Sequence, residues 1–138
     1  MFRHVGIVVE NLPIMKSFYC DFFKLEVLYQ QTEKGKFLSE ITNIYNAEAD
    51  IIKLGKNGQI FLELLDYKPK KNSQNICLDT KGITHFALTV DNSSDIFYKL
   101  SKNNYKCLSE PKISDNGLAK VFFCLDPEFN FIEIVEQL

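Results

Sequence analysis

The sequence has no long run of apolar residues. None of its hydrophobic segments approaches the roughly 20 residues that a membrane-spanning helix needs, so the sequence predicts no membrane segment. Residues 1–11 include Arg3, His4 and Glu10 and lack the apolar core of a signal peptide. Hydrophobic residues make up 46% and charged residues 25%, which excludes collagen, a coiled coil and extended disorder. We therefore expect a globular, cytoplasmic protein.

The sequence also lacks a strong charge of either sign and any C-x-x-C motif. The net charge is −2 and the basic residues form no stripe, so we expect no nucleic-acid partner. Because no export signal is visible, reduced thiols are expected at the four cysteines. Neither histidine is close in sequence to a cysteine, which argues against a catalytic thiolate. The four are Cys20, Cys77, Cys107 and Cys124.

A chain of 138 residues is one compact domain or two very small ones. Two related halves would each be near the lower limit for an independent hydrophobic core, so they would have to share structure. We therefore treat residues 1–138 as a single domain and look for an internal repeat.

Hydrophobic periodicity predicts the same order of elements in each half: a strand, a helix and about three strands. Asn11 is a candidate N-cap of the first helix, and Ser93 or Ser94 of the second. The first module is 1–66 and the second 83–138, joined by a polar linker at 67–82. Expected strands are 3–9, 25–30, 51–54, 59–65, 83–90, 106–108 and 131–135, with helices at 14–23 and 93–103, a loop at 32–36 and a hairpin at 113–126.

The repeat is also visible in individual residues. His4-Val5-Gly6-Ile7-Val8-Val9-Glu10-Asn11 aligns with His85-Phe86-Ala87-Leu88-Thr89-Val90-Asp91-Asn92, and Phe61-Leu62-Glu63-Leu64-Leu65 aligns with Phe131-Ile132-Glu133-Ile134-Val135. Matching residues at both ends of the module indicate a duplication. The first half is longer between its His and its Glu, and we place the extra residues near 32–49.

These matched positions contain the only two histidines of the sequence and one glutamate in each closing strand. A carboxylate in an apolar strand is costly to bury unless it is paired or binds a metal. Two imidazoles and two carboxylates would suit a divalent ion such as Zn, Ni, Co, Mn or Fe, whereas Mg is less suited to histidine. The candidate metal ligands are His4, Glu63, His85 and Glu133.

Two other interpretations of these residues remain open. In one, each histidine and glutamate simply faces solvent on a half-exposed sheet. In the other, the glutamates are structural carboxylates paired with Arg3 or a lysine, which explains the charges but not the histidines. Phe122 and Phe123 are adjacent in a strand, so one is expected in the core and the other on the pocket side.

Five stretches together carry a resemblance to a known family. They are 4–12, 18–27, 60–65, 85–91 and 126–134, beginning with His4-Val5-Gly6-Ile7 and ending with Asp126-Pro127-Glu128-Phe129-Asn130-Phe131-Ile132-Glu133-Ile134. Their order and spacing resemble the vicinal oxygen chelate superfamily, which includes glyoxalase I, methylmalonyl-CoA epimerase, bleomycin-resistance proteins and extradiol dioxygenases. The resemblance implies an α+β fold in which two βαβββ modules form an open, cup-shaped sheet around a metal.

The resemblance also implies a function and ligands. It implies that His4, Glu63, His85 and Glu133 bind the metal, which holds two adjacent oxygens of a substrate. Having both glutamates resembles the isomerase, epimerase and lyase members, so it implies a glyoxalase- or epimerase-type enzyme that moves a proton alpha to a metal-bound carbonyl through an enediolate. Glu63 or Glu133 would act as the base. The resemblance further suggests a small-molecule substrate and a homodimer.

The alternatives within this family are an extradiol-type dioxygenase and a non-catalytic antibiotic-binding protein. No match to the glutathione-binding residues of glyoxalase I is visible, so no substrate subfamily is assigned. Lys24 and Phe129 stand where relatives usually have glycine, and both replace a residue that tolerates a positive φ. These two departures make the local turn geometry uncertain from sequence but leave the ligand positions unchanged.

Overall fold

The computed structural model describes residues 2–70 and 76–138 and divides the chain into two compact units, Met1–Ser73 and Gln74–Leu138. Across these described ranges there are three helices and eight strands, with a four-stranded mixed sheet in each unit. The expected α+β class is confirmed. Part of the expected linker 67–82, namely 71–75, lies outside the described residues. No helix in the described ranges is long and apolar enough to cross a membrane.

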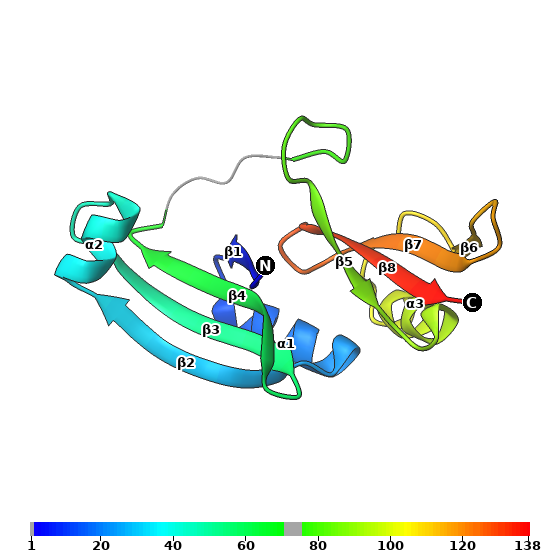
Figure 1. Cartoon of the computed structure of the whole chain (residues 1–138), viewed down its shortest axis with the longest axis horizontal. Helices are drawn as coiled ribbons and strands as arrows, with labels where there is room; N and C mark the ends of the chain where they lie inside the picture. Colours follow the sequence, from blue (N-terminus) through cyan, green and yellow to red (C-terminus); the bar gives the residue numbers. More distant parts are fainter. Residues whose placement is uncertain (1, 71–75) are drawn as a thin grey trace. The chain divides into compact units, whose positions relative to one another are not determined.

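The first unit contains a sheet in the order β1-β4-β3-β2 (Figure 1). The closing strand β4 runs parallel to β1, and the other neighbours are antiparallel. Its elements are β1 (Val5–Val8), α1 (Leu12–Phe23), β2 (Glu26–Lys34), α2 (Lys36–Thr42), β3 (Glu48–Lys56) and β4 (Gln59–Lys68).

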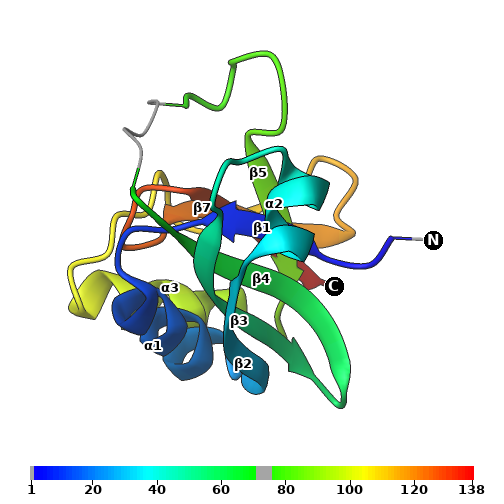
Figure 2. The same cartoon turned by 90° about the vertical axis from the view of Figure 1, so that its left-hand side faces the viewer.

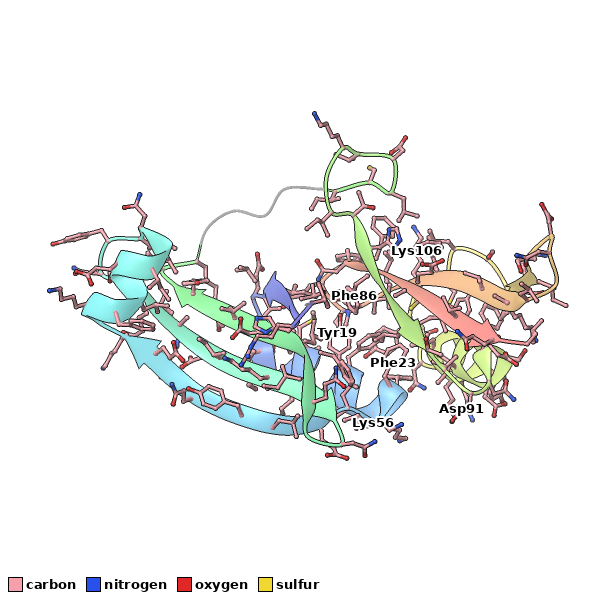
Figure 3. The ribbon with its side chains drawn as sticks, viewed as in Figure 1. Tyr19, Phe23, Lys56, Phe86, Asp91 and Lys106 are labelled. Carbon is pink, nitrogen blue, oxygen red and sulfur yellow. The ribbon has the colours of Figure 1, made fainter. Side chains whose placement is uncertain are left out.

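Helix α1 begins where the sequence predicts a cap. The Asn11 side-chain oxygen accepts a hydrogen bond from the Ile14 backbone N–H at 3.2 Å, and Pro13 lies in the first turn. The helix buries Phe18 and Tyr19 and contacts β3 and β4. Tyr19 and Phe23 both project from α1 (Figure 3), with ring centroids 6.2 Å apart. This aromatic face covers one side of the sheet.

Period-2 alternation in β4 separates a covered face from a more open one. Leu62 and Leu64 are buried, whereas Glu63, on the other face, is partly exposed. Helix α2 packs on the Glu63 face, because Leu38 clusters with Ala49 and Ile51 of β3. Figure 2 shows α1 and α2 on opposite sides of these strands. Helix α2 thus covers part of the face that carries Glu63, towards the β2 edge.

The second unit repeats this topology in the order β5-β8-β7-β6, again with a parallel pair formed by its first and last strands. Its core includes Leu100, Phe122 and Ile132, and Phe122 contacts Phe97 with ring centroids 5.7 Å apart. Its elements are β5 (His85–Thr89), α3 (Ser93–Lys102), β6 (Lys112–Ile113), β7 (Ala119–Leu125) and β8 (Phe131–Gln137).

The predicted cap of α3 is wrong by one or two residues. The N-cap is Asn92, whose side-chain oxygen accepts from the Asp95 backbone N–H at 3.0 Å. Ser93 instead donates its hydroxyl and its backbone N–H to Glu136, at 2.6 and 2.8 Å. Because Asn92 is the repeat counterpart of Asn11, the duplication extends to the helix caps.

The predicted loop at 32–36 is also wrong. Strand β2 continues to Lys34, because its backbone pairs with β3 up to the Lys34–Glu48 register. Helix α2 then begins at Lys36, inside the segment where the extra residues of the first half were expected. Strand β4 likewise extends to Lys68, into the expected linker. Backbone pairing with a neighbouring strand overrides the polar composition of both segments.

Lys24 and Phe129, where relatives usually have glycine, adopt the backbone conformation that favours glycine. Lys24 has a φ of 57° and Phe129 a φ of 67°, both in the left-handed region. Lys24 is the C-cap of α1, where its backbone N–H bonds to the Tyr19 carbonyl. Phe129 is in the turn before β8, where its N–H bonds to the Asp126 carbonyl at 3.0 Å. Both turns form despite the strain of a side chain there.

Candidate functional site

In the first unit, the structure brings His4 and Glu63 together. Residue 4 lies directly before β1, and the parallel register pairs Gly6 with Glu63. His4 Nε2 is 3.2 Å from Glu63 Oε2, and the side chains are 23% and 16% exposed. The imidazole and the carboxylate predicted from the repeat therefore lie in contact within this unit.

Lys53 completes this group. It lies opposite Glu63 in the β3–β4 register, and its Nζ is 3.0 Å from Glu63 Oε1. The Lys53 ammonium also lies over the Tyr29 ring, 5.0 Å from the centroid. The interpretation of Glu63 as a lysine-paired carboxylate is thus met at one oxygen, while the other oxygen faces His4.

In the second unit, His85 and Glu133 form the matching pair. His85 Nε2 is 3.7 Å from Glu133 Oε2, and Ala87 lies opposite Glu133 in the parallel register. The other ring nitrogen, Nδ1, lies 3.1 Å from the Thr84 hydroxyl. This contact orients the imidazole with Nε2 towards the carboxylate, as a hydrogen bond at the other ring nitrogen does in metal-binding histidines.

Phe123 takes the place in the second unit that Lys53 has in the first. It lies opposite Glu133 in the β7–β8 register, and its ring centroid is 5.1 Å from that of His85 in an edge-on arrangement. The expectation that one of Phe122 and Phe123 is in the core and the other on the site face is met, with Phe122 buried. The two pairs therefore differ in their third neighbour, a cation in one unit and an aromatic ring in the other.

The donor spacing in each unit fits coordination of one divalent ion. Two ligands, each about 2.1 Å from an ion, lie about 3.0–3.4 Å apart for angles between square and tetrahedral. The His4–Glu63 distance of 3.2 Å is within this range, and the His85–Glu133 distance of 3.7 Å needs only a small side-chain movement. Imidazole nitrogen with carboxylate oxygen is a donor set for Zn, Co, Ni, Mn or Fe.

Gly6 leaves space at the first pair. A Cβ atom there would lie 3.9 Å from Glu63 Oε2 and 3.5 Å from Leu65 Cδ1. In addition, His4 Nδ1 is buried and has no hydrogen-bond partner within the described ranges. The space at Gly6 fits a group supplied from outside beside Glu63 Oε2, whereas the unpartnered Nδ1 is not the nitrogen that faces this oxygen.

The carboxylates on this face affect the pKa of a neighbouring tyrosine. Partial burial raises the pKa of Tyr67, and the carboxylates of Glu63 and Glu33 raise it further. Tyr67 lies four residues after Glu63 in β4, so the alternation of the strand puts both side chains on the same face. The negative charge of Glu63 therefore acts on a tyrosine of the same strand.

Each histidine lies with the glutamate of its own unit. Within residues 2–70 and 76–138, no three His, Cys, Asp or Glu side chains gather around one point. Each pair therefore supplies two ligands, whereas catalytic zinc sites use three from the protein and structural sites four.

Sequence reasoning did not single out Lys53. The available signal was its position as the one charged residue in the apolar segment Ile51-Ile52-Lys53-Leu54, just as Glu63 interrupts an apolar strand. Two opposite charges, each interrupting an apolar segment of one hairpin, are a signal for a cross-strand pair once the register of the hairpin is known.

Comparison with known proteins identifies the family of the chain. Residues 2–134 match the model of the glyoxalase/bleomycin resistance protein/dioxygenase superfamily, so the chain belongs to that superfamily. A comparison with curated protein sequences finds no match.

Solved structures agree on the fold. A glyoxalase family protein from Bacillus cereus superposes with a TM-score of 0.89 at 18% identity, covering 99% of this chain and 93% of that chain. The trypanothione-dependent glyoxalase I of Leishmania major gives a TM-score of 0.66 at 18% identity, covering 96% and 84%. The fosfomycin resistance protein FosX of Listeria monocytogenes gives 0.59 at 11% identity, covering 100% and 93%. At these identities the likeness concerns the fold.

Proposed function

We propose that the protein is a metal-dependent lyase or isomerase that moves a proton alpha to a carbonyl group of a small-molecule substrate. His4 and Glu63 from one unit, with His85 and Glu133 from the other, would hold one divalent ion. Zn, Ni, Co, Mn and Fe all suit this donor set. We further propose that the active form is a homodimer.

The observation that carries this proposal is the duplicated His–Glu pair. In both units Nε2 of the histidine faces Oε2 of the glutamate, at 3.2 and 3.7 Å, and a small residue lies opposite each glutamate in the register. In both units the glutamate of the pair stands between apolar neighbours in its strand. A ligand that takes donors from both copies accounts for both pairs at once.

The proposed chemistry assigns a task to each type of residue. A divalent ion, when bound, supplies Lewis acidity towards adjacent substrate oxygens. The histidines are neutral ligands that keep the charge of the ion available. One glutamate removes the proton from the carbon next to the carbonyl and returns it, so it acts as general base and then as general acid. Glu63 and Glu133 are the two candidates for this transfer.

The reaction type is supported by the presence of two glutamates together with the superfamily, which includes glyoxalases. The Leishmania neighbour is a glyoxalase I, and a further neighbour from Agrobacterium tumefaciens is a lactoylglutathione lyase, with a TM-score of 0.62 at 16% identity, covering 99% of this chain and 92% of that chain. A proton transfer next to a carbonyl is the chemistry that a carboxylate beside a Lewis-acidic ion performs well.

Metal content of purified, untagged protein tests the ligand set. We expect one ion per chain in the unchanged protein, and a loss of that ion in both His4→Ala and Glu133→Gln. Glu40→Gln, at an exposed position on α2, is the matched control and should keep the ion. If each variant lost only half of the bound metal, the two units would hold separate ions. Full metal retention by both variants would refute the site.

Solvent exchange tests the reaction type. The metal-loaded protein is incubated in deuterated water with an α-hydroxy ketone, a hemithioacetal or an acyl thioester, and deuterium at the alpha carbon is measured by NMR. Exchange that is lost in Glu63→Gln or Glu133→Gln supports the proposal. Turnover that consumes dioxygen without exchange would instead show a dioxygenase, and antibiotic binding by metal-free protein without turnover would show a binding protein.

A further inference from the structure

Two cysteines of the second unit face each other across neighbouring strand segments. Cys107 and Cys124 form an antiparallel bridge, in which Cys124 belongs to β7 and Cys107 to the segment before β6. The Leu108 N–H donates to the Phe123 carbonyl, and the Leu125 N–H donates to the Lys106 carbonyl, both at 2.8 Å. These hydrogen bonds flank the cysteine pair, so Cys107 and Cys124 occupy a non-hydrogen-bonded position of the ladder.

That position has the spacing that a disulfide needs. Directly opposed residues at a non-hydrogen-bonded position have Cα atoms about 4.5 Å apart and side chains on the same face. Disulfides span Cα distances of about 4.4–6.8 Å. Both thiols are free in this structure. The backbone around them is therefore already arranged for a bond that has not formed.

We propose that Cys107 and Cys124 are an oxidation site, which a hydroperoxide converts into an intramolecular disulfide. The Cys107 sulfur attacks a peroxide oxygen, the O–O bond breaks, and a sulfenic acid and one water form. The Cys124 sulfur then attacks the Cys107 sulfur, the S–O bond breaks, and a second water leaves with the Cys124 proton. Two thiols lose two electrons in total, and one hydrogen peroxide is reduced to two waters.

The order of the two steps follows from exposure. Cys107 is partly exposed, whereas Cys124 is fully buried, so the peroxide reaches Cys107 first. Burial raises the pKa of both thiols, and the neighbouring Cys107 raises that of Cys124 further. A raised pKa reduces the thiolate fraction and slows the reaction, but Cys124 needs no diffusion to reach its partner.

The disulfide would close the chain around a hairpin. The segment between Cys107 and Cys124 contains β6 and the turn at Gly117, so the bond would fasten the edge of the sheet to β7. A cross-link of this kind restricts the unfolded chain and raises the melting temperature. No other pair of cysteines in the described ranges is joined by strand pairing.

Thiol counting after treatment with hydrogen peroxide tests the proposal. The protein is treated, denatured and alkylated, and its peptides are analysed by mass spectrometry without reduction. We expect two of the four thiols to resist alkylation and a linked peptide pair containing Cys107 and Cys124. The melting temperature should rise by several degrees, and dithiothreitol should reverse both changes.

Single substitutions separate this pair from non-specific oxidation. Cys107→Ser and Cys124→Ala should each abolish the linked peptide and the rise in melting temperature. Cys77→Ser removes an exposed thiol and should change neither. Linkage of Cys107 to another cysteine, linkage between chains, oxidation to sulfinic acid alone, or four thiols that all remain free would overturn the proposal. Cys107→Ser leaves the buried Cys124 unchanged. It therefore tests the proposal even if Cys124→Ala does not fold.

Discussion

The Lys53 ammonium lies 3.0 Å from one oxygen of Glu63, and the matching position opposite Glu133 is occupied by Phe123. Glu63 is therefore contacted at both oxygens, by Lys53 and by His4, whereas the pair in the second unit has an aromatic neighbour in place of the cation. The duplicated carboxylates are equivalent in sequence position but not in environment. We expect substitutions at the two glutamates to have different consequences for folding.

Glu63→Gln should destabilise the protein more than Glu133→Gln. Removing the Glu63 charge leaves the ammonium of Lys53, which is 23% exposed, beside a neutral amide. The free energy of unfolding should fall by about 1 kcal/mol. This is less than the cost of a fully buried unpaired charge, because Lys53 is partly exposed to solvent. Denaturant unfolding of metal-free protein measures it. Adding Lys53→Met to Glu63→Gln should recover part of the loss, and equal losses in the two glutamate variants would contradict this account.

Gly6→Ala should weaken metal binding without unfolding the protein. The added Cβ would make only ordinary contacts, 3.5 Å from Leu65 Cδ1 and 3.9 Å from Glu63 Oε2, so the fold has room for it. The methyl group would narrow the approach to the oxygen proposed to bind the ion. Calorimetric titration with Zn²⁺ should show roughly tenfold weaker binding, equivalent to about 1.4 kcal/mol. Unchanged affinity would show that Glu63 Oε2 is reached from another direction.

Glycine at Lys24 or Phe129 should stabilise the protein. Both residues have a positive φ, and a side chain in that region costs about 1 kcal/mol or more. Phe129 is 74% exposed, so Phe129→Gly gives up little burial. Lys24→Gly loses only an exposed hydrogen bond to the Asp21 carbonyl. We expect each change to raise the free energy of unfolding by about 0.5–1 kcal/mol.

Lys16→Gly is the control for these two substitutions. Lys16 is inside α1, where glycine should destabilise by about 1 kcal/mol. If all three changes lowered stability alike, the left-handed geometry at Lys24 and Phe129 would not be what limits stability.

The Glu136–Ser93 contact should make stability depend on pH. Hydrogen bonds from the Ser93 hydroxyl and backbone N–H lower the pKa of the Glu136 carboxyl below its ordinary value of 4.5. A lowered pKa in the folded state means that the contact stabilises the protein above pH 4.5, and that this stabilisation is lost as the pH falls through the folded-state pKa. Glu136→Gln should therefore lower the melting temperature at pH 7.

The difference in melting temperature between the unchanged protein and Glu136→Gln should shrink as the pH falls below 4.5. Glu110→Gln, at an exposed position, is the control and should leave the pH profile unchanged. A difference that stays constant from pH 7 to pH 3 would mean that Glu136 acts through its shape rather than its charge.

Most of the fold was predictable because duplication doubles the signal. The strand after His4 and its counterpart after His85 have the same alternating pattern, and α1 and α3 each begin after an asparagine. Each weak local signal gained weight from its repeat. Helix α2 has no counterpart among residues 76–138 of the second unit, so its short polar segment offered no repeat to support it.

The composition of each His–Glu pair was predictable, but its third neighbour was not. Lys53 and Phe123 lie opposite the glutamates because of the register between neighbouring strands. That register depends on where the hairpins turn and where a bulge occurs, such as the one between Leu54 and Gly55. A one-residue slip would turn Lys53 to the other face of the sheet, so sequence alone does not fix this contact.

The position of α2 has a consequence for how such a protein can diversify. In the order β1-β4-β3-β2, the added helix follows the strand at one edge, while His4 lies at the opposite edge, beside β1. Leu38 of α2 packs on Ala49 and Ile51 of β3, with Leu65 of β4 against the same cluster, so a change in α2 alters what covers the Glu63 face. The pairing of β1 with β4 holds His4 beside Glu63 independently of α2, so sequence change in α2 can reshape the surroundings of this pair without removing it.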